Sequence, residues 1–147
     1  MIIHLDACCL NRLTDDQSQQ RIFKEAEAVA CVLGLIQEEQ VHWVSSTALE
    51  IEISRNPDVD RQRDVTALLT FANETVAPDS ATADRAAFLH RLGFSVFDAL
   101  HLASAEQGQV EVFLTIDDDL IRRGRRYGKV LRVRVQNPIS WYEEMRR

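Results

Sequence analysis

Residue types that mark special classes of protein are scarce in this sequence. Among its 147 residues there are 3 cysteines, 3 prolines and 5 glycines, too few for a disulfide scaffold or a collagen-like chain. The hydrophobic fraction of 46% is typical of a chain with a packed core and excludes a disordered one. A chain of this length suits one domain over residues 1–147 and leaves little room for a second.

Long apolar runs are also missing, since none approaches the roughly 20 residues that span a bilayer. The first six residues contain no lysine or arginine, and Asp6 stands where a signal peptide would be apolar. The cysteine count is odd, Cys8 and Cys9 are adjacent, and no spacing of cysteine and histidine is typical of a zinc site. We therefore expect reduced cysteines in a cytoplasmic protein that is not embedded in a membrane.

Lysine is scarce, with 2 lysines against 15 arginines, and the basic residues are unevenly distributed. Residues 120–134, which we call the basic segment, hold 7 of the 17 basic residues and no acid, which leaves 10 basic residues against 23 acids elsewhere. The net charge of -6 argues against a general nucleic-acid coat protein, whereas the basic segment predicts contacts with the phosphates of a polyanion. The alternative is that the basic segment binds no anion and is only a solvated helix end followed by a strand edge.

Short β-prone runs alternate with helical patterns along the chain. The strand-like runs are Met1–Leu5, Val41–Val44, Thr75–Ala77, Val112–Thr115 and Val130–Val135. This alternation favours an α/β fold in three layers, with a parallel sheet of four or five strands that is covered by helices on both faces.

Helices are predicted between these strands from apolar spacing and from capping residues. The predicted helices are 21–39, Thr47–Arg55, one that restarts at Asn56-Pro57, 80–92, one from Ser95 to Gln107, Asp118–Tyr127 and Trp141–Arg147. In the first of them apolar residues recur at steps of 4 and 3, a stripe that we assign to the core before a dimer or partner surface. Asn56 is the predicted N-cap of the restarted helix, with Pro57 in its first turn, and Ser95 with Asp98 has the form of a capping box.

Acidic residues follow the predicted strands at the edge where such sheets bind ligands. Asp6 ends the first strand, Asp117 comes two residues after the Val112–Thr115 strand, and Asp98 lies at a helix start. Because the carboxyl ends of parallel strands meet at one edge, these acids should converge there with a glutamate from the helix after the second strand. Converging carboxylates raise one another's pKa, and a hard divalent cation such as Mg²⁺ or Mn²⁺ would relieve the repulsion and activate water. The sequence gives Asp6 no visible capping role.

Several of these acids have a structural alternative. Asp98 also fits a helix cap, and for Asp118 and Asp119 we prefer the interpretation that they supply favourable charge in the first turn of a helix. Glu50 and Glu52 are two positions apart on a helix and point about 200° apart, so only one of them can face the site.

At these residues the sequence resembles the PIN-domain ribonucleases, the fold of the VapC-type toxins. The matching pieces are Leu5–Arg12, Ser46 followed six residues later by Glu52, Asp98–Ala105 and Leu114–Asp118. Together they extend from the first predicted strand to the fourth. The stretch D-A-L-H-L-A followed by T-x-D is the most specific of them.

The resemblance implies a Mg²⁺-dependent endoribonuclease, with Mn²⁺ as an alternative ion. Its catalytic residues would be Asp6, Glu52, Asp98 and Asp117, and its metal ligands would be Asp6, Asp98 and Asp117. The serine-to-glutamate spacing favours Glu52, whereas an alignment of T-x-x-E would select Glu50 instead.

Four further residues near these motifs receive weaker assignments. The resemblance makes Thr115 a hydroxyl that supports the last acid. For His101 we prefer a structural role to that of a general acid, because a metal-activated water needs none. Asn11 and Arg12 are equally consistent with a phosphate contact and with a local structural role.

The resemblance also implies partners. The protein would be the toxin of a type II toxin–antitoxin system, would form a homodimer, would cut RNA, and would be silenced by an antitoxin whose tail enters the acidic cleft. Two alternatives remain open at this point. The same acids would serve a structure-specific DNA nuclease, and a PIN-like fold can also bind RNA or a partner protein without cutting.

Overall fold

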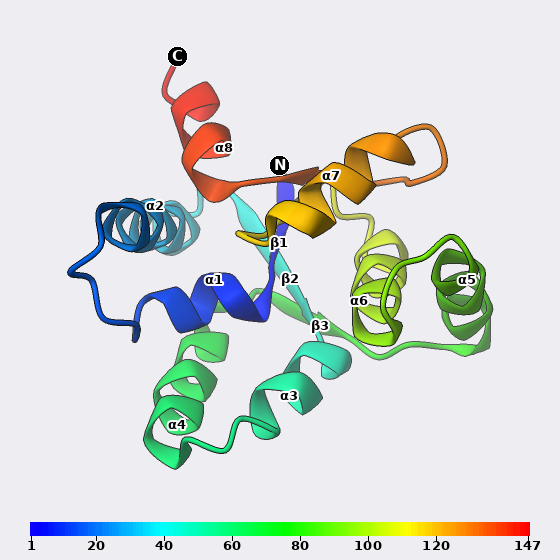
Figure 1. Ribbon diagram of the computed structural model, residues 1–147, viewed down its shortest axis with the longest axis horizontal. Coiled ribbons are helices and arrows are strands. Elements are labelled where there is room, and N and C mark those ends of the chain that lie inside the picture. Colours follow the sequence, from blue (N-terminus) through cyan, green and yellow to red (C-terminus); the bar gives the residue numbers. More distant parts are fainter.

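The computed structural model describes residues 1–147 and has a central sheet between two layers of helices (Figure 1). The five strands, each parallel to its neighbours, are β1 (Ile2–Leu5), β2 (His42–Ser46), β3 (Glu74–Val76), β4 (Val112–Leu114) and β5 (Arg134–Gln136). Their order across the sheet is β3-β2-β1-β4-β5. The predicted α/β fold with a parallel sheet of four or five strands is confirmed.

The helices pack on both faces of this sheet. They are α1 (Ala7–Arg12), α2 (Gln20–Gln37), α3 (Thr47–Ser54), α4 (Val59–Leu68), α5 (Ser80–Arg91), α6 (Val96–Gln107), α7 (Asp118–Arg126) and α8 (Pro138–Met145), with a short 3₁₀ helix at Leu69–Phe71. Figure 1 shows α1, α2, α4 and α8 on one side of the sheet and α5 and α6 on the other. None of the helices combines the length and apolar character needed to cross a membrane.

Apolar side chains fill both interfaces between sheet and helices. One cluster of 18 buried residues includes Ile3, Trp43 and Trp141 and joins β1 and β2 to α2 and α8. The other, of 14 buried residues, includes Phe113 and Leu102 and joins β4 to α6. The apolar stripe of α2 lies in the first cluster, as predicted. Burial of each large apolar side chain is worth about 1.5–3 kcal/mol, so the two clusters hold the strand ends in fixed positions.

The helix after α3 begins later than predicted. Asp58, not Asn56, is the N-cap of α4, and its carboxylate accepts the amide of Arg61 at 3.1 Å. The Asn56 side chain accepts the amide of Asp58 at 3.0 Å instead. Pro57 therefore lies in a turn before the helix, and the prediction that Asn56 caps it was wrong.

The last strand and the last helix also differ from their predicted bounds. The strand predicted over 130–135 begins only at Arg134, because the residues before it form a turn whose amides donate to the Tyr127 carbonyl. Its partner β4 also has just three residues to pair with. The terminal helix begins three residues earlier than predicted, at Pro138, because the side chain of Asn137 caps it.

A left-handed turn places the start of α6. Gly93 has φ 109°, a backbone conformation that side-chain-bearing residues rarely adopt, and it redirects the chain from α5 toward the edge of the sheet. Ser95 is then the N-cap of α6, as predicted, and its hydroxyl accepts the amide of Asp98 at 3.1 Å. The turn and the cap together bring Asp98 to the carboxyl edge of the strands.

Candidate active site

Asp6 follows β1 directly and lies at the carboxyl edge of the middle strand of the sheet. Its Oδ1 accepts the amide of Ala7 at 2.9 Å, so Asp6 is also the N-cap of α1, a role that the sequence did not reveal. Its Oδ2 accepts the Thr115 hydroxyl at 2.9 Å and the Cys8 thiol at 3.4 Å. These contacts fix both oxygens of a carboxylate that is only 5% exposed.

The charge of Asp6 has no arginine or lysine partner, and the basic side chain beside it is His101. No lysine or arginine forms an ion pair with it. The pKa of Asp6 is raised from 3.8 to about 6, and burial is the main cause. The negative charges of Glu52 and Asp98 contribute to this rise, whereas His101 and Thr115 oppose it. The carboxylate is therefore held in place but is not neutralised by the protein.

Glu52 reaches the same edge from α3. Its Oε2 pairs with Nε2 of His101 on α6. The ligand atoms of Asp6, Glu52 and His101 all lie within 4.8 Å of one another, so we call these three residues the central group. Glu50 is exposed and lies outside the central group, which leaves Glu52 as the glutamate beside Asp6.

His101 is part of the site rather than a histidine satisfied within the core. Its side chain is 1% exposed, yet Nδ1 has no hydrogen-bond partner. Burial alone would lower the pKa of His101, but the hydrogen bond to Glu52 and the charges of Asp6, Glu52 and Asp98 outweigh burial, and the net pKa is raised. The sequence contained one signal for this position, because His101 follows Asp98 by three residues and shares its helix face.

Asp98 lies in the first turn of α6 and is half-buried. Burial is the main cause that raises its pKa, and the charges of Asp117 and Glu52 add to the rise against Ser95 and His101. Asp98 is not in the central group. The charges of Asp117 and Glu52 nevertheless act on Asp98, so these three carboxylates are close enough to interact.

Asp117 is exposed and caps α7, with Oδ1 accepting the amide of Leu120 at 3.2 Å. Its own amide donates to the Thr115 hydroxyl at 3.2 Å, and that hydroxyl in turn donates to Asp6. Thr115 is fully buried. Thr115 therefore connects Asp117 to Asp6 through two hydrogen bonds. The sequence predicted support for Asp117 only.

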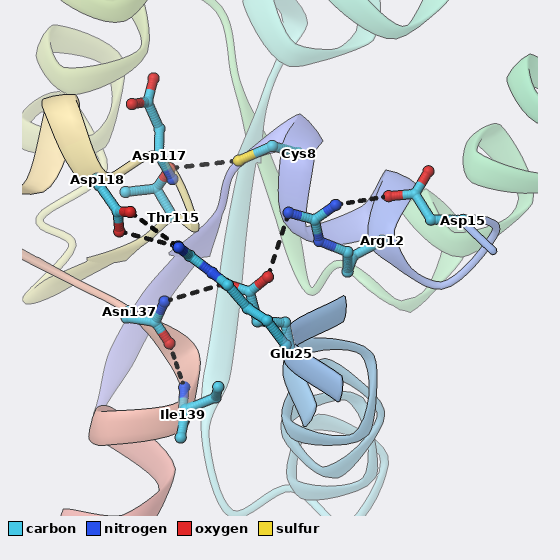
Figure 2. Close-up of polar contacts among 10 residues, drawn as sticks. Cys8, Arg12, Asp15, Glu25, Thr115, Asp117, Asp118, Asn137 and Ile139 are labelled. Carbon is cyan, nitrogen blue, oxygen red and sulfur yellow. Dashed lines mark hydrogen bonds and ion pairs between the residues drawn. The ribbon is translucent and has the colours of Figure 1, made fainter. Parts of the chain in front are cut away.

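A second buried carboxylate, Glu25 on α2, is surrounded by basic groups (Figure 2). Glu25 is 0% exposed and pairs with Arg12 at 3.2 Å and Arg21 at 3.4 Å, while the Asn137 amide donates to it at 3.4 Å. We call these four residues the Glu25 cluster. Arg12 also pairs with Asp15 at 3.0 Å, so the structure gives Arg12 a structural role. Sequence reasoning missed this cluster, because nothing distinguishes Glu25 from the other acids of its helix.

The acids at the start of α7 have partners on the protein itself. Nη2 of Arg21 lies 3.0 and 2.9 Å from the two oxygens of Asp118, and Asp119 pairs with Arg122. Both acids lie in the first turn of the helix, where negative charge is favourable. This agrees with the structural interpretation preferred for them.

The basic segment divides into a paired and an unpaired part. Arg122 is paired with Asp119 at the start of α7. Arg125, Arg132 and Arg134 form no ion pair, and they line a cleft of about 400 Å³ between α7 and β5. Arg123, Arg126 and Lys129 also form no ion pair, so most of the basic segment is free to contact an anion.

Comparisons with known proteins agree with this architecture. The PIN domain family model matches residues 3–126. The crystal structure of FitAcB from Neisseria gonorrhoeae is 17% identical, with a TM-score of 0.60, and covers 94% of this chain and 98% of its own. VapBC2 from Rickettsia felis, bound to a DNA fragment from its promoter, is 12% identical, with a TM-score of 0.55 and coverage of 93% and 98%.

VapBC-1 from nontypeable Haemophilus influenzae is 13% identical, with a TM-score of 0.58, and covers 94% of this chain and 98% of its own. At these identities the likeness shows a shared fold. No curated protein matches the sequence.

Proposed function

The chain belongs to the PIN-domain family, and on that premise we propose that it is a divalent-metal-dependent endoribonuclease, built as one domain over residues 1–147. The observation that carries the proposal is the convergence at one sheet edge of acids that pair with no lysine or arginine. Asp6, Glu52 and Asp98 come from different elements, and Asp6 and Asp98 have raised pKa values. Perturbed titratable groups that gather in this way are typical of functional sites.

In this proposal each acid has a defined role. Asp6, Asp98 and Asp117 hold the cation, with Mg²⁺ as the expected ion and Mn²⁺ as the alternative, while Glu52 orients the attacking water. A bound divalent cation supplies a water of lowered pKa and stabilises the charge that develops on a phosphodiester. Thr115 keeps an oxygen of Asp6 in place through its hydrogen bond of 2.9 Å.

The partners follow from the same premise. We propose that the protein is the toxin of a type II toxin–antitoxin system, acts in the cytoplasm on RNA, forms a homodimer and is silenced by a cognate antitoxin. The fold shared with FitAB and VapBC proteins supports the toxin role. An acidic edge without its own cations also suits a basic partner segment.

The cleavage test compares polymers and cations. Single-stranded RNA and DNA of the same sequence are incubated with the metal-stripped protein plus Mg²⁺ or Mn²⁺, and then with EDTA. We expect RNA to be cut only with the cation present, and we expect the Asp98→Asn variant to be inactive. Asp119→Asn is the matched control, because Asp119 is also an aspartate at this end of the molecule but already pairs with Arg122.

The possible outcomes separate the three functions. Cleavage of DNA alone would replace the proposal by a DNA nuclease. Absence of cleavage together with absence of cation uptake in calorimetry would replace it by a module that binds without cutting.

The unpaired arginines give a separate test of substrate binding. Replacing Arg125 and Arg132 with glutamine should weaken binding of single-stranded RNA. It should also reduce the slope of log affinity against log salt concentration by about 1.4, since each phosphate contact on a single strand contributes about 0.7. Binding is measured with the cation-free protein, so that cleavage does not interfere. An unchanged slope would show that the basic segment does not contact the RNA backbone.

A further inference from the structure

We propose that the imidazole of His101 is a direct ligand of the divalent cation, so that the centre is a mixed imidazole–carboxylate site that prefers Mn²⁺ or another first-row transition ion to Mg²⁺. This inference rests on the proposed function only in requiring a cation at the acidic edge, and it makes Glu52 a ligand of that cation together with Asp6. The expectation of Mg²⁺ assumed a ligand set made of oxygens alone. The structure adds a nitrogen to that set.

The first argument is the distance between the ligand atoms. One nitrogen of His101 and one oxygen each from Asp6 and Glu52 lie within 4.8 Å of one another. Small divalent ions contact their ligands at about 2.0–2.2 Å, so ligand atoms about 4 Å apart can share one ion. Nε2 of His101 and Oε2 of Glu52 are already in direct contact. Asp98 and Asp117 do not meet the same distance criterion.

The second argument is that the imidazole is fixed in place. The ring of His101 stacks with that of Phe97 at a centroid distance of 5.7 Å and an interplanar angle of 26°. It also stacks with the ring of His4 at 6.4 Å and 29°. A ring that is 1% exposed and held by two others cannot turn its Nε2 away from Glu52 toward solvent. A ligand held in this way is preorganised for a cation.

The third argument comes from two buried nitrogens without partners, Nδ1 of His101 and Nε2 of His4. His4 Nδ1 lies 2.8 Å from the carbonyl oxygen of Val44, and because a carbonyl can only accept, Nδ1 carries the proton and Nε2 is a bare acceptor. Ligation of a cation through Nε2 of His101 places the proton of that ring on Nδ1. The two unpartnered atoms then become a donor and an acceptor, on rings whose centroids lie 6.4 Å apart.

His4 is therefore the outer partner of the ligand in this proposal. Histidines that bind metals usually donate their second ring N–H to an acceptor, and loss of that acceptor typically costs about 10–100-fold in metal affinity.

The preference for a transition ion follows from the ligand atoms. Imidazole suits transition ions, whereas sites made only of carboxylate and water suit Mg²⁺.

The experiment detects directly whether a histidine nitrogen binds the cation. Metal-stripped full-length protein is loaded with Mn²⁺ and examined by electron spin-echo envelope modulation, with natural histidine and with ¹⁵N-labelled histidine. We expect a ¹⁴N coupling from a bound imidazole, which is replaced by a ¹⁵N pattern in the labelled protein. The coupling should disappear in His101→Asn and persist in His42→Asn, a control in which the histidine pairs with Glu74 at 3.3 Å.

Metal affinities provide the second readout. Calorimetric titration should give tighter binding of Mn²⁺ than of Mg²⁺, and the ratio of the two affinities should fall toward 1 in His101→Asn. His4→Phe keeps an aromatic ring at this position but removes the acceptor nitrogen. This variant should lose about 10–100-fold in Mn²⁺ affinity while retaining the ¹⁴N coupling. Circular dichroism checks that each variant is folded. If a variant does not fold, the ¹⁵N-labelled wild-type protein still shows whether a histidine nitrogen binds Mn²⁺.

Two results would overturn the inference, and they differ in what else they affect. Mn²⁺ bound without any histidine coupling would show that His101 only positions Glu52, and the nuclease proposal would stand. Absence of binding by Mn²⁺ and by Mg²⁺ would remove the cation centre itself, and both proposals would fail.

Discussion

The fold buries two carboxylates near α1, and it treats them differently. Glu25 is 0% exposed and contacts two arginines and an amide. Asp6 is 5% exposed and contacts a hydroxyl, a thiol and a backbone amide, but no arginine or lysine. Taking a charge out of water costs several kcal/mol unless it is paired. The protein offsets that cost with two arginines at Glu25, whereas at Asp6 it provides no arginine or lysine.

This difference teaches how a structural acid is distinguished from one that we propose to be functional. Burial is similar at the two sites, so burial alone does not mark the active site. The distinguishing feature is the arginine partners, which Glu25 has and Asp6 lacks. In our proposal a bound cation supplies the positive charge at Asp6. Each prediction below changes one side of this comparison.

The largest effect is expected from Asp6→Asn, which removes the charge and keeps the cap on α1. Cleavage should fall by at least about 10²–10³-fold, the loss that follows removal of one electrostatic group from an active site. The unfolding free energy of the metal-free protein should not fall, because an uncompensated buried charge is gone. Gel-based cleavage rates and urea unfolding measure both quantities. Cleavage near the wild-type rate would refute the assignment of Asp6.

The second effect, on stability, is expected at the Glu25 cluster. Glu25→Gln leaves Arg12 next to a neutral side chain and should lower the unfolding free energy by about 3 kcal/mol. This value is at the lower end of the range for a broken buried pair, because Arg12 keeps its second partner, Asp15. Glu27→Gln is the matched control on the same helix, where Glu27 is exposed, and should change stability by less than about 0.5 kcal/mol. Equal stabilities of the two variants would contradict the comparison.

A third effect concerns the pH dependence of the metal-free protein. The pKa of Asp6 rises from 3.8 in the unfolded chain to about 6 in the folded one, so the folded state binds more protons between these values. Stability from this group is therefore present below about pH 4 and is lost as pH rises toward 6, by on the order of 3 kcal/mol.

Unfolding curves of the wild type and Asp6→Asn between pH 4 and 7 isolate this loss. The stability difference between them should grow in favour of the variant as pH rises. A difference that stays constant across this range would show that Asp6 does not titrate there.

The smallest effect is expected at the exposed pair between Arg21 and Asp118. Their side chains are 57% and 53% exposed, and such pairs contribute about 0–1 kcal/mol. Asp118→Asn should therefore change the unfolding free energy by less than about 1 kcal/mol and leave cleavage unchanged. A loss comparable to that of Glu25→Gln would mean that the Glu25 cluster extends to α7.

The sequence predicted the layers of the fold more accurately than the ends of its elements. Apolar spacing identified α2, and Ser95 identified the start of α6, because both signals are local. The start of β5 depends on which residues of β4 are available to pair with it, and the cap of α4 depends on which of two nearby side chains reaches the helix amides. Both outcomes are decided by contacts that a linear pattern does not contain.

The order of residues by itself determined an α/β chain with acids at the ends of its strands. Apolar runs indicate the strands, and the acids follow those runs closely in the sequence. Only the tertiary structure decided that Glu52 faces Asp6, that His101 joins them, and that Glu25 is paired with arginines while Asp6 is not. The physical reason is that a side chain's electrostatic environment depends on its neighbours in space. Those neighbours come from helices and strands far apart along the chain, which packing of the two hydrophobic clusters brings together.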